Sequence, residues 1–224
     1  MALNRIWVYA EAADGKVAPI TLEILTKARE LGGTVEAVYG DGDGDAVAGA
    51  LGAHGATKVY ATGDLQGSTP GIPVASAMAK LIEGGERPDL ILFGTTYEGR
   101  DVAARLSVAL DQPVLTNNVD IAADGDSVVV TEPVFGGTKL VRTRFTGTGP
   151  HIALIRPKSF AAEESGGGPA EVVTIEVPDY GTAKVRNRHV EEHTGPKLDE
   201  AAVVVSGGRG LGAAEKYQII EDLA

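Results

Sequence analysis

The sequence has 224 residues, of which 31 are acidic and 20 are lysine or arginine, so its formal net charge is −11. Nucleic acids and anionic membranes are bound mainly through clustered basic side chains, and this charge argues against both as partners. The absence of cysteine excludes disulfides, thiol catalysis and thiolate metal sites. No apolar run is long enough for a transmembrane helix. We therefore expect a soluble, cytoplasmic protein with a core that folds without cross-links.

The first half of the chain alternates between strand-like and helix-like segments. Apolar runs rich in β-branched and aromatic residues predict strands, and apolar residues spaced by three and four predict helices. Because only a few residues connect these segments, the alternation is typical of an α/β fold, a doubly wound, mainly parallel sheet with helices on both faces. The predicted strands are residues 3–10, 34–39, 57–61, 90–94 and 113–116, and the predicted helices are residues 17–31, 46–53, 74–82 and 99–110.

The pattern changes after residue 118, where strand-like segments follow one another without helices between them. The residues Asp124-Gly125-Asp126 between two such segments are typical of a hairpin turn. We therefore predict an antiparallel β segment added to the α/β core. Its predicted strands are residues 119–122, 127–131, 139–145, 152–155 and 172–177.

A polar stretch that contains Gly195-Pro196 predicts a domain boundary. We assign residues 1–190 to a first domain, residues 191–197 to a linker and residues 198–224 to the start of a second domain. Within the last segment we predict a strand over 201–206 and a helix over 213–224. One such βα unit cannot bury both faces of its strand. We therefore expect either that another chain completes the unit or that the chain is a truncated form of a longer protein.

The turn between that strand and helix is rich in glycine. Its sequence, SGGRGLGA, places Gly208, Gly210 and Ala213 at the spacing of a dinucleotide-binding loop, in which backbone N–H groups approach a phosphate at a helix N-terminus. Arg209 adds a positive charge suited to a phosphate or a flavin. The acidic residue that would confirm a dinucleotide site, about 20 positions further on, would lie past Ala224. A turn without a ligand is the alternative, and the arginine favours contact with a ligand.

A second candidate site lies where the predicted first and fourth strands end. In a sheet of order 3-2-1-4-5 these strands flank the topological switch point, so the loops at residues 10–16 and 95–100 would border a ligand crevice. Arg100 and Asp101 could equally begin a helix as solvated charges. The two interpretations are evenly supported.

Metal binding and catalysis find little support in the sequence. Residues 41–45 hold three aspartates but lack the later glycine and glutamate of a calcium loop, so they predict a turn and a helix cap. His189 and His193 are four residues apart without the glutamate of a zinc motif. Arg142 and Arg144 share one face of a predicted strand and could serve an interface or face solvent. We assign no catalytic residue and no metal ligand.

Several of these segments together resemble the alpha subunit of electron transfer flavoprotein, over essentially the whole chain. The most specific is residues 204–211 (VVSGGRGL), which resembles the entry to the family's flavin domain. Residues 3–11 resemble its opening strand, residues 94–105 its fourth strand-to-helix step, and residues 155–157 the close of its first domain.

The resemblance implies a Rossmann-like first domain, a C-terminal domain that holds FAD, and a beta subunit that carries AMP. Such a heterodimer carries electrons in fatty acid β-oxidation, from acyl-CoA and other flavin dehydrogenases to a membrane quinone oxidoreductase. We therefore expect an electron carrier and not a catalyst with its own substrate. By motif position Arg209 matches an arginine that contacts FAD, with Gly208 and Gly210 beside it. The family continues past Ala224, so we expect this chain alone to bind no FAD and to act mainly as structure and subunit interface.

A different hypothesis makes the first domain a nucleotide-binding module of the adenine nucleotide hydrolase type. The residues Ser206-Gly207-Gly208 resemble the opening of its pyrophosphatase loop. That loop follows the first strand of its domain and continues with Asp-Ser, whereas Arg209-Gly210 stand here. The mismatch favours the flavoprotein hypothesis.

Overall fold

The computed structural model describes residues 3–13, 15–125, 127–187, 189, 198, 201 and 203–224. The chain forms two compact units, Met1–Arg186 and Asn187–Ala224, which we call the N-terminal and C-terminal units and describe separately. The predicted linker at residues 191–197 lies outside the described residues.

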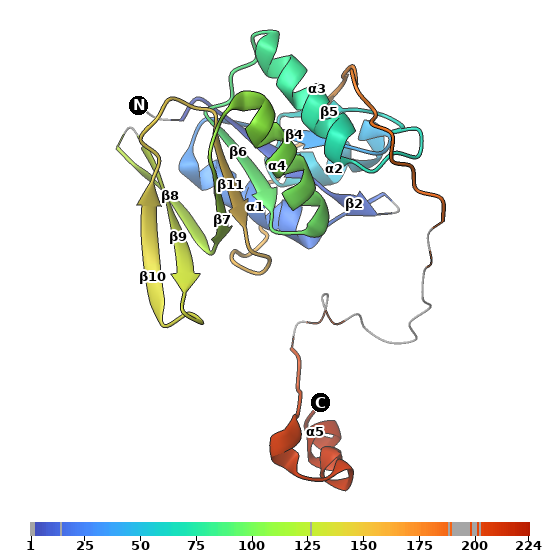
Figure 1. Ribbon diagram of the computed structural model, residues 1–224, viewed down its shortest axis with the longest axis vertical. Coiled ribbons are helices and arrows are strands. Elements are labelled where there is room, and N and C mark those ends of the chain that lie inside the picture. Colours follow the sequence, from blue (N-terminus) through green and yellow to red (C-terminus); the bar gives the residue numbers. More distant parts are fainter. Residues whose placement is uncertain are drawn as a thin grey trace. The chain divides into compact units, whose positions relative to one another are not determined.

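A sheet of seven parallel strands forms the centre of the N-terminal unit (Figure 1). The strand order is β12-β5-β4-β1-β6-β11-β7, and every neighbouring pair is parallel. The predicted α/β fold with a mainly parallel sheet is thereby confirmed. The strands are β1 (Arg5–Ala10), β4 (Thr34–Tyr39), β5 (Lys58–Ala61), β6 (Leu90–Gly94), β7 (Val114–Asn118), β11 (His151–Ile155) and β12 (Glu171–Thr174).

Two strands that the sequence assigned to the antiparallel segment belong to this parallel sheet instead. Strand β11 lies between β6 and β7, and β12 extends the opposite edge beside β5. The prediction was wrong because it followed chain order, whereas the chain inserts β11 between two earlier strands. The composition of β11 offered a signal, because its continuous apolar run, buried from Ile152 to Ile155, is typical of a strand covered on both faces.

A separate antiparallel sheet of order β10-β9-β8 confirms the rest of the predicted β segment. Its strands are β8 (Asp120–Asp124), β9 (Ser127–Val134) and β10 (Lys139–Arg144). A short hairpin of β2 (Ala12–Ala13) and β3 (Lys16–Val17) replaces the predicted turn after β1. Helix α1 therefore begins at Pro19, two residues later than predicted, because proline is favoured at a helix start and disfavours helical backbone in the residue before it.

Four helices cover the sheet, two on each face. Residues of α1 and α2 pack with Ile6 and Val8 of β1, whereas residues of α3 and α4 pack with Trp7 and Tyr9. Adjacent residues of a strand point to opposite faces, so β1 contributes to two separate hydrophobic clusters. The helices are α1 (Pro19–Leu31), α2 (Gly44–Ala53), α3 (Gly71–Glu83) and α4 (Tyr97–Leu110). In the part of the chain that the structure describes, no helix is long and apolar enough to cross a membrane.

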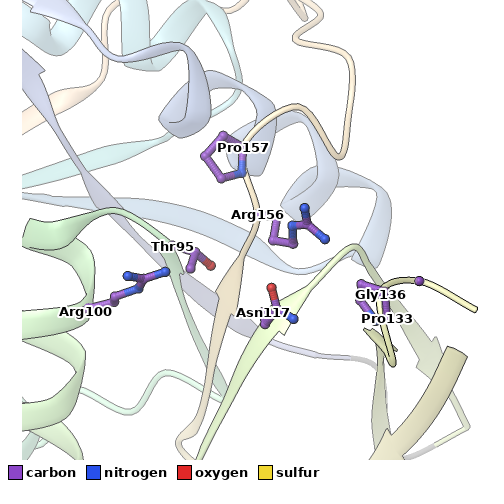
Figure 2. Close-up of a pocket in the computed structure, with 8 residues that line it drawn as sticks. Thr95, Arg100, Asn117, Pro133, Gly136, Arg156 and Pro157 are labelled. Carbon is purple, nitrogen blue, oxygen red and sulfur yellow. The ribbon is translucent and has the colours of Figure 1, made fainter. Parts of the chain in front are cut away.

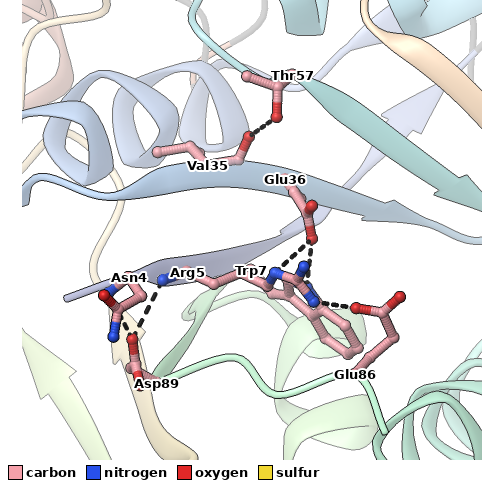
Figure 3. Close-up of polar contacts among 8 residues, drawn as sticks. All are labelled: Asn4, Arg5, Trp7, Val35, Glu36, Thr57, Glu86 and Asp89. Carbon is pink, nitrogen blue, oxygen red and sulfur yellow. Dashed lines mark hydrogen bonds and ion pairs between the residues drawn. The ribbon is translucent and has the colours of Figure 1, made fainter. Parts of the chain in front are cut away.

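A polar network fixes the start of β1 against its neighbours (Figure 3). The indole Nε1 of Trp7 donates to Oε2 of the buried Glu36 at 2.9 Å. The Arg5 guanidinium pairs with both Glu36 and Glu86. Asp89, just before β6, accepts a hydrogen bond from the backbone N–H of Arg5 at 3.1 Å. The network therefore joins β1 to β4 and to the entry of β6, and it gives the buried carboxylate of Glu36 two partners.

The C-terminal unit is small and has no buried side chain among its described residues. It contains two 3-10 turns, η1 (Arg209–Leu211) and η2 (Ala214–Tyr217), and the helix α5 (Gln218–Leu223). The helix predicted over residues 213–224 is thus right only for its second half. The strand predicted over 201–206 is wrong for the described residues 201 and 203–206, since no described strand of this unit lies there to pair with it.

Candidate functional site

The loops after β1 and β6 meet at the topological switch point of the sheet, as predicted, but side chains close the crevice between them. The Thr96 hydroxyl donates to Oε1 of Glu11 at 2.8 Å. The Tyr9 hydroxyl donates to Oε1 of Glu98. Thr96 also caps α4 by accepting from the backbone N–H of Gly99 at 2.8 Å. Each loop is therefore tied to the other through a carboxylate.

The backbone of this region requires small residues. A Cβ at Gly99 would lie 2.3 Å from the carbonyl oxygen of Gly94, a distance that real Cβ atoms do not show. A Cβ at Gly94 would lie 3.0 Å from the Ile20 side chain. The two glycines thus allow the sharp step from β6 into α4. They serve close packing here.

The electrostatics of the crevice disfavour a phosphate. Burial, reinforced by the nearby charge of Glu98, raises the pKa of Glu11 to about 7, although the hydrogen bond from Thr96 acts in the opposite direction. Burial and the same Glu98 also raise the pKa of Tyr9 well above its usual value. Negative charge on Glu98, and on Glu11 once it is ionised, would repel an anionic ligand at the switch point.

An open pocket of about 650 Å³ lies beside this crevice, at the carboxyl ends of β6, β11 and β7 (Figure 2). We call it the arginine pocket. Arg100 was predicted near a ligand crevice and lines this pocket instead. Asn117 and Arg156 were not predicted as site residues, because β11 was not placed next to β6. The lining residues are Thr95, Arg100, Asn117, Pro133, Gly136, Gly137, Arg156 and Pro157.

The glycine-rich loop of the C-terminal unit forms a shallow pocket of about 330 Å³ around Arg209. A Cβ at Gly208 or Gly210 would meet nothing within 4 Å, so packing does not require glycine at these positions. A Cβ at Gly207, in contrast, would lie 2.4 Å from the Leu211 side chain. Room beside Gly208 and Gly210 is compatible with close approach of a ligand. The assignment of Arg209, Gly208 and Gly210 to a cofactor site stays a prediction.

The remaining candidates have structural explanations. Asp43 caps α2 by accepting from the backbone N–H of Asp45 at 3.0 Å, which confirms the predicted turn and cap. Arg144 pairs with Asp124 across the small sheet. Within the described ranges, no group of three or more potential ligands could hold a metal ion. His193 lies outside the described residues.

Comparison with known proteins agrees with this architecture. Residues 6–180 match the family described as electron transfer flavoprotein domain. Electron transfer flavoprotein subunit alpha of Syntrophomonas wolfei is 31% identical and covers 97% of this chain and 69% of its own length. The protein of the same name from Mycobacterium tuberculosis is 32% identical, over 99% of this chain and 70% of its own length. Protein FixB of Rhizobium meliloti is 27% identical, over 99% of this chain and 67% of its own length.

The family match covers most of the chain, and the similarity to proteins named as alpha subunits extends into the C-terminal unit. The chain therefore belongs to the electron transfer flavoprotein family.

Proposed function

We propose that this chain acts as the alpha subunit of a heterodimeric electron transfer flavoprotein in the cytoplasm. It would carry electrons from acyl-CoA and other flavin dehydrogenases to a quinone oxidoreductase. The observation that carries the proposal is the similarity to named alpha subunits over 97–99% of the chain. The N-terminal unit would serve mainly as structure and as the interface to the beta subunit.

The acidic switch point supports this assignment over the alternative of an adenine nucleotide hydrolase-like module. In open α/β sheets a nucleotide binds in the crevice at the switch point, with its phosphates near backbone N–H groups. Here Glu11 and Glu98 occupy that place and are tied to Thr96 and Tyr9. A phosphate would meet two carboxylates there, which is unfavourable.

The β9–β10 hairpin offers the best surface for the beta subunit. Strand β10 is an edge strand of the small sheet, so one side of its backbone is available for pairing. Phe135 at the turn is 79% exposed and Leu140 is 64% exposed, although both are large apolar residues. Arg142 alternates with Leu140 and so lies on the same face of β10. Exposed aromatic, aliphatic and arginine side chains together are typical of protein interfaces.

The interface proposal is tested by the affinity of the chain for the beta subunit of the same organism. We expect Phe135→Ala and Leu140→Ala each to weaken binding by about tenfold, the effect of losing one well-buried interface side chain. The control is Val108→Ala, because Val108 is 81% exposed on α4. Equal affinities for all three variants and the unchanged chain would place the interface elsewhere.

The flavin part of the proposal rests on Arg209. A guanidinium in a glycine-rich loop can pair with a phosphate or stack on a flavin edge. Arg209 is exposed on η1, and within the described residues no ion pair occupies it. It is therefore accessible to a cofactor. In the alpha subunits that the chain resembles, further segments would supply most of the FAD contacts.

Quenching of flavin fluorescence tests this role. We expect no saturable quenching of FAD by the chain alone and saturable quenching by a chain that continues through the family's flavin domain, in complex with the beta subunit. In the complex, Arg209→Ala should weaken FAD binding by about tenfold, whereas the exposed Arg186→Ala should not. Equal binding by both variants would remove Arg209 from the site. A complex that binds no FAD would contradict the proposed flavin carrier.

A further inference from the structure

We propose that the arginine pocket is an oxyanion site, which takes either inorganic phosphate or the phosphate group of a small hydroxylated ester. It lies entirely in the N-terminal unit and does not involve Arg209, although Pro133, Gly136 and Gly137 of the β9–β10 hairpin form part of its wall. The inference does not require that the chain is an alpha subunit, and phosphate binding and beta-subunit binding are measured separately, so each can fail without the other.

Two arginines from different elements line the pocket. Arg100 lies in the first turn of α4, and Arg156 follows β11. Among the described residues neither guanidinium forms an ion pair, whereas Arg105, one turn further along α4, pairs with Asp101 at 2.8 Å. Both arginine side chains are exposed and can be reached by a ligand. In a chain of net charge −11, two guanidiniums at one pocket, neither in an ion pair with a described residue, favour a bound anion. Glu132, which accepts from Asn117, is a carboxylate near the same wall.

The hydroxyl of Thr95 adds an unsatisfied donor to the same pocket. Its Oγ1 is buried and has no hydrogen-bond partner in the structure. The backbone holds it in place, because the N–H of Thr95 donates to the carbonyl of Ile155 at 2.7 Å. A buried hydroxyl without a partner is unfavourable, and an oxyanion that reached it from the pocket would accept a hydrogen bond from it. In Figure 2, Arg100 reaches from α4 towards Thr95, and Arg156 lies on the other side of Thr95.

Asn117, on the opposite wall of the pocket, indicates which second functional group the ligand has. Nδ2 of Asn117 donates to Oε1 of Glu132 at 3.5 Å, which leaves its amide oxygen as an acceptor facing the pocket (Figure 2). An acceptor there suits a hydroxyl of the ligand and not a second charged oxygen. The backbone of Asn117 is left-handed, with φ of 60°. The pocket volume of about 650 Å³ exceeds what a phosphate alone needs and lies within the usual range for small-molecule sites.

Its place in the fold agrees with this chemistry. Ligands of open α/β sheets bind outside the carboxyl ends of the strands, and α4 directs the positive end of its dipole to this edge. The switch point next to it is closed by Glu11 and Glu98. The proposed anion site therefore lies one strand away from the switch point. The switch point is between β1 and β6, and the arginine pocket is at the carboxyl ends of β6, β11 and β7. Because β11 is inserted beside β6, it brings Arg156 next to Thr95.

Calorimetric titration of the whole chain with inorganic phosphate, glycerol phosphate and glycerol, at constant ionic strength, tests the proposal. We expect saturable binding of at least one of the two phosphates and none of glycerol. Arg100→Gln and Arg156→Gln should each weaken phosphate binding by about tenfold. Arg87→Gln is the matched control, because Arg87 is exposed at the opposite end of β6 and should retain affinity within about twofold.

Thr95→Val separates a ligand-binding role from a structural one. It preserves the shape of the side chain while removing the unsatisfied hydroxyl. We therefore expect weaker phosphate binding, by about fivefold, together with an unchanged or higher melting temperature without phosphate. Tighter binding of glycerol phosphate than of inorganic phosphate would identify an ester as the ligand, and equal or weaker binding would identify the free anion.

Three results would overturn the proposal. The first is a lack of saturable binding of either phosphate by the unchanged chain. The second is an equal loss of affinity in Arg87→Gln and Arg156→Gln, which would indicate nonspecific charge attraction. The third is an effect of the two pocket arginines on beta-subunit binding with none on phosphate, which would assign them to an acidic protein partner.

Discussion

The two units of the chain differ in how their apolar residues are placed. In the N-terminal unit the side chains of Trp7 and Ile24 are fully buried, and helices cover both faces of the sheet. In the C-terminal unit Val203 is 80% and Ile219 64% exposed, and none of the described residues is buried. Apolar burial is the main source of folding free energy. Burial of apolar side chains therefore stabilises the fold of the N-terminal unit, whereas the C-terminal unit exposes apolar side chains that suit contact with another protein surface.

Matched isoleucine substitutions test this contrast and should give the largest effect. Ile24→Ala removes a fully buried side chain from α1 and should lower the free energy of unfolding by about 3 kcal/mol. Ile219→Ala removes an exposed one from α5 and should change it by less than about 0.5 kcal/mol. Denaturant unfolding followed by Trp7 fluorescence measures both. Similar losses for the two variants would show that the C-terminal unit shares the main core.

Substitutions in the polar network of the N-terminal unit should have the second-largest effect on the free energy of unfolding. Glu36→Ala removes the partner of the Trp7 indole and one partner of Arg5, and it should lower the free energy of unfolding by about 2 kcal/mol. Glu36→Gln keeps an acceptor for the indole and should cost less. The control is Glu30→Ala, an exposed partner of Lys27, with an expected loss below about 0.5 kcal/mol. If Glu36→Ala proved as mild as Glu30→Ala, the network would not stabilise the fold.

The acidic switch point should give a smaller, pH-dependent effect. The pKa of Glu11 in the folded chain, about 7, lies above its ordinary value of 4.5. The folded state therefore holds the proton more tightly, and the stability contributed by Glu11 falls as pH rises from about 4.5 to about 7 and then stays constant. Glu11→Gln should raise the free energy of unfolding by about 1 kcal/mol at about pH 8 and change it little at about pH 4.

Melting temperatures of Glu11→Gln across that pH range measure the difference. Glu30→Gln serves as the control, since Glu30 is exposed and should show no such dependence. A stability difference that does not vary with pH would mean that Glu11 is not held protonated in the fold. The phosphate titrations of the arginine pocket complement this measurement. They test two positively charged side chains at a site one strand away from the acidic switch point.

Local patterns predicted the core of the N-terminal unit well and its assembly only in part. Strands β4 and β6 have the predicted bounds, because their apolar runs end at glycine or polar residues. The position of β11 could not be read from local sequence, since an apolar run does not specify which strand lies beside it. For the same reason the arginine pocket could not be predicted from the sequence. Its residues Thr95 and Arg156 are 61 positions apart and come together only because β6 and β11 are neighbours.

For the candidate cofactor loop, the motif could be recognised from the sequence, but the structure around it could not be predicted. Its glycine spacing and Arg209 were visible in the sequence, and the family resemblance gave them a role. The strand expected before the loop did not form in the described residues, because strand structure requires a neighbour and the unit provides none there. A motif can thus be recognised from residue types even where the structure around it depends on contacts outside the segment.

The central claim is that this chain pairs with a beta subunit as the alpha subunit of an electron transfer flavoprotein. Size-exclusion chromatography with light scattering, applied to an equimolar mixture of the chain and the beta subunit of the same organism, tests it most directly. We expect a single species with the mass of a one-to-one complex. Two separate monomers would contradict this pairing.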